Sequence, residues 1–283
     1  MIKQTFLDIA EPSYEQARAV IIPVPYDVMA SYGTGARFGP DAIIRASSQI
    51  ETYDEELEHD LEDLPIFTRE PIGPIKSSPE AMMDAVEAAV REVDEARKIP
   101  VVLGGDHSLS IGPTRYFAKK IPGVGILHLD AHTDLRHEWE GSRFSHACGM
   151  RHAYDLGAQL VQVGLRSMPK EVIDECRERR TVFHAPRVPV PEIVAALPEK
   201  IYVSLDVDVL DPSLMPSTGT PEPGGIGWYD LLALLRAVAK EREVLGFDLM
   251  ELSPIPGIVH PEFTAARLVT KFLGYLFVQE RGR

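Results

Sequence analysis

The sequence predicts an α/β protein with three layers, in which helices cover both faces of a central, mostly parallel sheet. Short apolar runs rich in β-branched residues alternate along the chain with segments that carry apolar residues at helical spacing. The runs are almost continuously apolar, as expected of parallel strands buried on both faces. No change in composition suggests a linker, so we expect the 283 residues to form a single domain, 1–283.

The expected strands are the apolar runs, and turn residues end several of them. Prolines end the first strand, and two glycines form a sharp turn at the end of the third. The runs lie at 19–25, 66–68, 100–105, 125–130, 160–166, 181–183, 200–206 and 244–251.

The expected helices carry start signals or apolar residues at helical spacing. Pro40 suits the first turn of the first helix, and Ser78 followed by Pro79 is a typical N-cap. We expect helices at 41–48, 78–97, 169–180, 228–240 and 262–278.

Two other segments are expected to be irregular. The glycine-rich loop at 31–41 matches neither the P-loop nor the dinucleotide-binding pattern, so we assign it no phosphate. The acidic segment 51–63 is expected to be a solvated face.

Charge and cysteine content exclude several classes of function. The formal net charge of −14 argues against nucleic acid or an anionic membrane as a partner and is compatible with a cationic substrate. Two cysteines, Cys148 and Cys176, make neither a disulfide framework nor a zinc ribbon. We find no signal-peptide core in the first eight residues and no apolar run of membrane-spanning length, so we expect a cytoplasmic protein.

The strand at 200–206 ends in a way that points to a metal. Asp206 and Asp208 are two residues apart, so they point the same way from an extended chain. Two carboxylates side by side repel each other, and burying them without a partner is costly. A bound cation would remove that conflict.

Two other strands also end in polar groups that could join this site. Ligands of an open parallel sheet bind where the carboxyl ends of strands meet, so we expect the three sets to converge. The sets are Asp106 and His107, then Asp130, His132 and Asp134, then Asp206 and Asp208. Carboxylates with a minority of imidazoles suit manganese best, with zinc or iron as substitutes. So many carboxylates suit two metals about 3.5–4 Å apart better than one.

The motifs at 104–108, 130–134 and 204–212 together resemble the metal-binding motifs of the ureohydrolase (arginase/agmatinase) family. They read Gly-Gly-Asp-His-Ser, Asp-Ala-His-Thr-Asp and Ser-Leu-Asp-Val-Asp-Val-Leu-Asp-Pro. The resemblance implies a parallel-sheet fold, two Mn²⁺ per chain, and hydrolysis of a guanidino group to urea by a hydroxide bridging the manganese ions. It also implies a homotrimer or homohexamer.

The resemblance assigns metal ligands residue by residue. One manganese would be held by His107, Asp130, Asp134 and Asp206. The other would be held by Asp130, His132, Asp206 and Asp208. Asp130 and Asp206 would bridge the two ions, and we expect Asp130 to take part in catalysis. For Asp106 and Asp211 we prefer a supporting or turn-capping role.

The resemblance also implies residues for substrate binding and proton transfer. His146 lies where the family has its mobile proton-shuttling histidine, and Glu251 resembles the family's guanidinium-binding glutamate. A carboxylate that accepts parallel N–H bonds gives both affinity and orientation. Ser167 stands where arginases place an Asp that binds the substrate's α-amino group.

Agmatine is the expected substrate, because the residues that would bind the α-amino and α-carboxylate groups of arginine are absent. Where arginases have an Asn after the second motif, this chain has Leu135 and Arg136. We expect Arg136 to point to solvent or to pair with Glu138 or Glu140. If it faced the pocket, it would favour an acidic substrate such as 4-guanidinobutyrate.

Other enzymes remain open as alternatives. An N1-aminopropylagmatine ureohydrolase, a guanidinobutyrase, an arginase and a formiminoglutamate hydrolase are all family relatives. Single-zinc enzymes of the histone-deacetylase type share the general architecture, but His107 and Asp134 would complete a second site that one zinc does not require. A non-catalytic relative would be marked by lost ligands, and every motif ligand is present.

Overall fold

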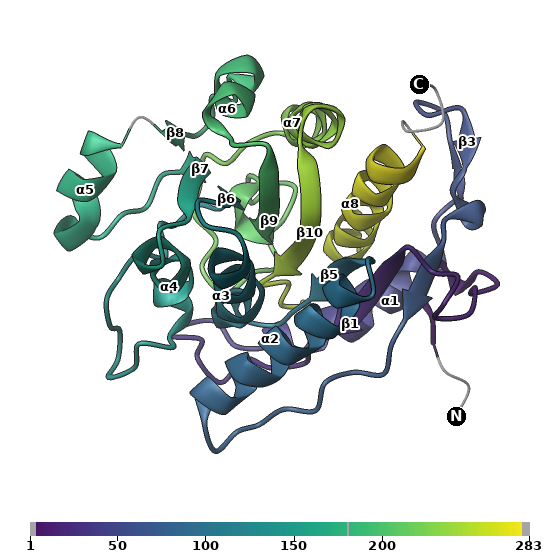
Figure 1. Cartoon of the computed structure of the whole chain (residues 1–283), viewed down its shortest axis with the longest axis horizontal. Coiled ribbons are helices and arrows are strands. Elements are labelled where there is room, and N and C mark those ends of the chain that lie inside the picture. The colour runs from purple at the N-terminus through teal and green to yellow at the C-terminus, as the bar shows by residue number, and fades with distance from the viewer. Residues whose placement is uncertain (1–3, 180, 279–283) are drawn as a thin grey trace.

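The computed structural model describes residues 4–179 and 181–278, and an eight-stranded sheet lies at its centre (Figure 1). The strands are β1 (Ala19–Pro23), β4 (Ile66–Thr68), β5 (Ile99–Leu103), β6 (Gly125–Leu129), β7 (Gln159–Leu165), β8 (Val182–His184), β9 (Lys200–Asp206) and β10 (Glu243–Met250). Their order is β4-β1-β5-β10-β9-β6-β7-β8, and each neighbouring pair is parallel.

Helices cover both faces of this sheet, which confirms the predicted three-layer α/β/α class. One layer holds α1 (Gly39–Ser47), α6 (Val190–Ala196), α7 (Trp228–Glu241) and α8 (His260–Phe277). The other holds α2 (Pro79–Glu95), α3 (Ile111–Lys120), α4 (Gly149–Asp155) and α5 (Ile173–Glu178). Alternate residues of a strand face opposite layers, so Leu127 of β6 belongs to the first core and Ile126 to the second.

The helix expected at 169–180 is shorter than predicted. The 3-10 turn Lys170–Val172 precedes α5, which ends at Glu178, and residue 180 lies outside the described residues. Helices α3, α4 and α6 were not predicted. They contain 10, 7 and 7 residues, and the longest of them, α3, buries residues such as Gly112 and Thr114 that do not mark an apolar face.

The prediction of a solvated face at 51–63 was confirmed in part, because Glu51, Glu55 and Glu58 are exposed whereas Asp54 is buried. This segment forms the antiparallel pair β2 (Tyr53–Asp54) and β3 (His59–Asp60). Leu61 is fully buried, and Lys271 of α8 lies 2.8 Å from Asp54 Oδ2 and 2.9 Å from Glu56 Oε2. Asp54 and Glu56 therefore pair with a cation of α8, so the charge of these two residues does not mark a free surface.

The sheet order brings the predicted site residues to one place. The four middle strands are β5, β10, β9 and β6, and their carboxyl ends lead into His107, Glu251, Asp206 and Asp130. β5 and β6 are consecutive strands in the sequence but are separated in the sheet by β10 and β9, and such a change in strand order opens a crevice at the edge of a parallel sheet. No helix among the described residues is both long enough and apolar enough to cross a membrane.

Candidate metal centre

His107 lies among three carboxylates at the carboxyl edge of the sheet. Its Nδ1 atom is 3.0 Å from Asp130 Oδ2, 3.2 Å from Asp134 Oδ2 and 3.1 Å from Asp206 Oδ2. All these side chains are buried. The structure thus brings together the first set of ligands predicted from the sequence.

His132 completes a second group beside the first. Its Nδ1 atom is 2.9 Å from Asp208 Oδ2 and 3.5 Å from Asp130 Oδ1. The two oxygens of Asp130 therefore face different groups, Oδ2 toward His107 and Oδ1 toward His132. Asp130 occupies the shared position expected of a bridging ligand.

The backbone that carries these side chains is tightly constrained in its conformation. Gly105 precedes Asp106 and His107, and a Cβ atom there would lie 1.7 Å from the carbonyl oxygen of Tyr26. Asp134 and Glu251 have left-handed backbone conformations, with φ of 49° and 67°. Non-glycine residues adopt this region only where their surroundings hold them, and such strain is concentrated at functional sites.

Asp106 and Asp211 lie outside both groups. Asp106 accepts hydrogen bonds from the backbone N–H groups of Met29 (2.9 Å) and Ser108 (3.1 Å), so it fixes the turn that carries His107. Asp211 accepts from Ser213 and from the backbone N–H groups of Gly224 and Gly225. Both carboxylates therefore cap turns.

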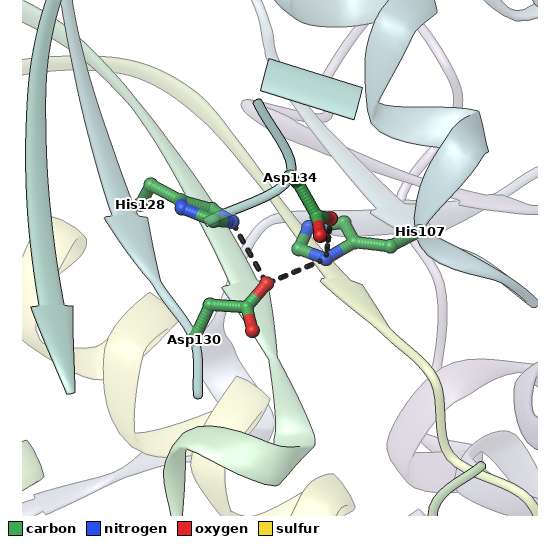
Figure 2. A group of neighbouring side chains, drawn as sticks. All are labelled: His107, His128, Asp130 and Asp134. Carbon is green, nitrogen blue, oxygen red and sulfur yellow. Dashed lines mark ion pairs between the residues drawn. The ribbon is translucent and has the colours of Figure 1, made fainter. Parts of the chain in front are cut away.

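His128 is a member of the cluster that the sequence analysis missed. Its Nε2 atom lies 2.8 Å from Asp130 Oδ2, as Figure 2 shows beside His107 and Asp134. The side-chain amide of Gln162 is 2.9 Å from His128 Nδ1, so it can donate there and leave the imidazole proton on Nε2, facing Asp130. Asp130 directly follows β6 and lies two residues after His128, which was a sufficient signal because residues two apart in an extended chain share a face.

The charges of the cluster perturb one another. Burial, with the charges of Asp208 and Asp130, holds the pKa of Asp206 well above its usual range. Burial and Asp130 also raise the pKa of Asp208. Burial acts to lower the pKa of His107, but its contacts with Asp130, Asp134 and Asp206 outweigh burial and hold that pKa well above its usual value.

The donor atoms present fit two divalent cations. Carboxylate oxygens dominate, with a minority of imidazole nitrogens, as hard to borderline ions prefer. Among the described residues, the buried atoms His107 Nδ1, Asp130 Oδ2 and Asp208 Oδ2 have ion-pair partners only within the cluster itself, and a cation among them would relieve the cost of burying so many carboxylates together. Two sets of donor atoms lie close enough together to hold an ion: His107, His128, Asp130 and Asp134, and Asp130, His132 and Asp208.

A pocket of about 310 Å³ opens onto this cluster. Glu251, His146 and Ser167 all line it. Glu251 Oε1 accepts the backbone N–H of His107 at 2.8 Å and lies 3.4 Å from His146 Nδ1. Burial acts to lower the pKa of His146, but the contact with Glu251 outweighs it, so the pKa rises to about 9. A protonated imidazole and a carboxylate therefore face the same pocket.

Arg136 also lines the pocket, and its expected partners were wrong. It pairs with Glu171, instead of Glu138 or Glu140, and its guanidinium lies 4.0 Å from the centre of the Trp139 ring. The charge of Arg136 is thus neutralised within the protein.

Comparison with known proteins gives consistent matches over nearly the whole chain. The model of the arginase family matches residues 17–274. The N(1)-aminopropylagmatine ureohydrolase of Thermus thermophilus is 41% identical over 92% of this chain and 91% of its own length. The agmatinase of Pyrococcus horikoshii is 34% identical over 95% and 93%. The structure of the agmatine ureohydrolase of Thermoplasma volcanium superimposes with a TM-score of 0.91 and 27% identity, covering 100% of this chain and 97% of that one.

Proposed function

The chain belongs to the arginase family, and on that premise we propose that this ureohydrolase hydrolyses the guanidino group of agmatine to give putrescine and urea. One observation carries the proposal. The two groups of metal donors share Asp130 and open into a pocket that also holds Glu251 and His146. A pair of divalent ions, a carboxylate and a proton donor are the components that such a hydrolysis needs.

We propose two Mn²⁺ per chain as the cofactor. His107, Asp130, Asp134 and Asp206 would hold one ion. Asp130, His132, Asp206 and Asp208 would hold the other. When bound, two such ions supply a water nucleophile near neutral pH and neutralise developing charge. His128 would orient Asp130 through the contact between His128 Nε2 and Asp130 Oδ2, as partners of metal ligands commonly do.

Glu251 would bind the guanidinium. The backbone N–H of His107 holds Oε1 in place, and Oε2 makes no hydrogen bond to the described residues. A carboxylate positioned in this way can accept N–H bonds from a planar cation and fix it against the metal centre.

His146 would supply the proton that hydrolysis requires. An amine departs only when it is protonated, so a proton donor must lie near the carbon–nitrogen bond that breaks. The Nδ1 atom of His146 faces Glu251 at 3.4 Å, next to the proposed guanidinium position. Its raised pKa favours the protonated form at neutral pH.

The surroundings of the pocket favour a substrate without an α-carboxylate. Arg136 is the cation that could bind such a group, and it is already paired with Glu171. Ser167 lines the pocket where an Asp would be needed to hold an α-amino group. These observations support agmatine over arginine or 4-guanidinobutyrate.

N1-aminopropylagmatine is the second candidate substrate, and the relatives favour it. Proteins named N(1)-aminopropylagmatine ureohydrolase are 35–41% identical to this chain. Those named agmatinase are 34–36% identical. Both substrates end in the same guanidino group and differ only in the far amine.

A urea-release assay on manganese-loaded protein tests the proposal. We expect kcat/KM to be highest for agmatine or N1-aminopropylagmatine and lower by at least about 100-fold for arginine and 4-guanidinobutyrate, because a buried unpaired charge in the pocket costs several kcal/mol. Formiminoglutamate would release formamide and glutamate instead of urea, so its turnover is measured as glutamate release and should be equally low. If no guanidino compound releases urea above background, the ureohydrolase activity proposed here is wrong, as in a non-catalytic relative. A preference for arginine would contradict the substrate assignment alone.

We also propose that the protein acts in the cytoplasm and assembles as a homotrimer or homohexamer. The acidic composition and the family resemblance support this assignment. Light scattering during gel filtration would give the mass of the assembly, and a monomer of 31.4 kDa would contradict it.

A further inference from the structure

Ser31 connects two loops at the mouth of the pocket. Its Oγ atom accepts a hydrogen bond from Trp139 Nε1 at 2.9 Å and lies 2.9 Å from His146 Nε2. All three residues line the pocket. Ser31 belongs to the loop between β1 and α1, whereas Trp139 belongs to the long loop after β6 and His146 begins the 3-10 turn at the end of that loop.

The contact with Trp139 restricts what the Ser31 hydroxyl can do. The indole N–H is only a donor, so one lone pair of Ser31 Oγ is committed to it. A protonated His146 donates its Nε2 proton to the other lone pair of Oγ, and its Nδ1 proton lies on the side of Glu251. When Nδ1 gives up that proton, the neutral ring keeps the Nε2 proton and the same hydrogen bond to Oγ. The contact with Ser31 is therefore kept before and after proton transfer.

We propose that Ser31 is a positioning residue for the reaction, which holds the His146 ring so that Nδ1 faces Glu251 and the departing amine. The inference rests on the proposed function, because it requires His146 to deliver a proton. Without Ser31, the ring of His146 would keep only the contact at Nδ1 and could turn away from the pocket. Trp139 acts indirectly, because its hydrogen bond fixes the hydroxyl of Ser31.

The test compares steady-state kinetics of the manganese-loaded full chain with agmatine or N1-aminopropylagmatine, whichever the wild type uses better. We expect Ser31→Ala to lower kcat about 10-fold, as loss of an orienting partner typically does, while KM and metal content stay within about 2-fold. Ser31→Thr keeps the hydroxyl and should recover most of kcat. Ser31 is exposed, so these changes should leave folding intact.

Two further variants separate this role from a general effect on the loop. Tyr32→Phe also removes one hydroxyl, from the neighbouring residue whose side chain is exposed, and should leave kcat unchanged. Trp139→Phe removes the N–H donor and should lower kcat by less than Ser31→Ala. Combining Trp139→Phe with Ser31→Ala should add little, because both act through one contact.

The outcomes separate this inference from the proposed function. Wild-type turnover together with an unchanged kcat in Ser31→Ala would overturn the role of Ser31 and leave the ureohydrolase proposal intact. The same holds if Ser31→Thr is as slow as Ser31→Ala, or if KM alone changes. A wild-type protein that releases no urea would overturn both.

Discussion

At the scale of single residues, Asp130 is the most connected group of the site. Its Oδ2 atom faces His107 and its Oδ1 atom faces His132, and His128 of β6 also contacts Oδ2. Burial acts to raise its pKa, but the neighbouring histidines His128, His107 and His132 outweigh burial and hold the pKa well below its usual range. Asp130 is therefore an anion that both proposed metal positions share.

We expect Asp130→Asn to remove metal as well as activity. An amide has lost the negative charge that would neutralise two ions, so bound manganese should fall below two per chain and turnover by at least about 100-fold. Elemental analysis after gel filtration measures the metal. The same substitution at Asp211, which caps a turn, should leave metal content unchanged. Unchanged metal in Asp130→Asn would rule out a bridging role.

We expect His146→Ala to separate turnover from metal binding. Removing a proton donor typically costs about 100-fold or more in rate, whereas His146 contributes no atom to the two groups of donors. Urea release should fall while manganese stays at the wild-type level. His260→Ala, which removes an exposed histidine at the start of α8, is the control. Normal turnover in His146→Ala would remove this residue from the mechanism.

Some residues of the site are marked by a short sequence pattern, whereas others are defined by contacts between segments that are far apart in the sequence. Asp206 and Asp208 were found because two carboxylates at strand spacing are a local conflict, and family resemblance supplied roles for the rest. His128 carried the same local signal and was overlooked beside Asp130. The contacts of Ser31 with Trp139 and His146 span 108 and 115 residues, so no local pattern could predict them.

At the scale of elements, the strands were predictable because burial on both faces makes them continuously apolar. Strands β5, β6, β9 and β10 lie where expected to within one or two residues. The ion pairs of the acidic segment around Glu56 were not predicted, because composition does not show which cations of other helices lie beside it. Those cations are Lys271, on α8, and Arg236, on α7.

The pairing of Glu56 predicts an acid-dependent loss of stability. Burial acts to raise the pKa of Glu56, but Lys271, Tyr275 and Arg236 outweigh burial and lower it. A carboxylate with a depressed pKa stabilises the fold above its unfolded pKa, about 4.3, and this contribution disappears as the pH falls through the folded pKa. Because Glu56 is partly exposed, its contribution should be below about 1 kcal/mol.

Urea unfolding at several pH values measures this effect. Glu56→Gln should be less stable than the wild type at pH 7, and the difference should shrink below about pH 4.3 and disappear as the pH falls through the lowered pKa of Glu56. Glu55→Gln, at the exposed neighbouring position, should behave as the wild type at every pH. A difference between Glu56→Gln and the wild type that does not change with pH would show that the charge of Glu56 is not its cause.

At the scale of the whole molecule, the site depends on the order of strands in the sheet. β5 and β6 are consecutive in sequence, yet β10 and β9 lie between them. The alternation of strands and helices predicted a parallel sheet in which the carboxyl ends of the strands lie at the same edge. It did not predict the order of the strands. The order depends on how helices pack across both faces, which is a property of the complete core. The convergence of ligands was predictable, whereas the pocket wall at Trp139 and Arg136 was not.

We propose that the two metal ions of one chain act together in urea release. Titrating metal-free protein with Mn²⁺, while measuring bound metal and urea release from agmatine and N1-aminopropylagmatine, tests this two-ion mechanism. We predict that turnover of at least one of the two substrates reaches its maximum only at two ions per chain. Full turnover at one ion per chain, or no urea from either substrate at two, would show that two ions do not act together.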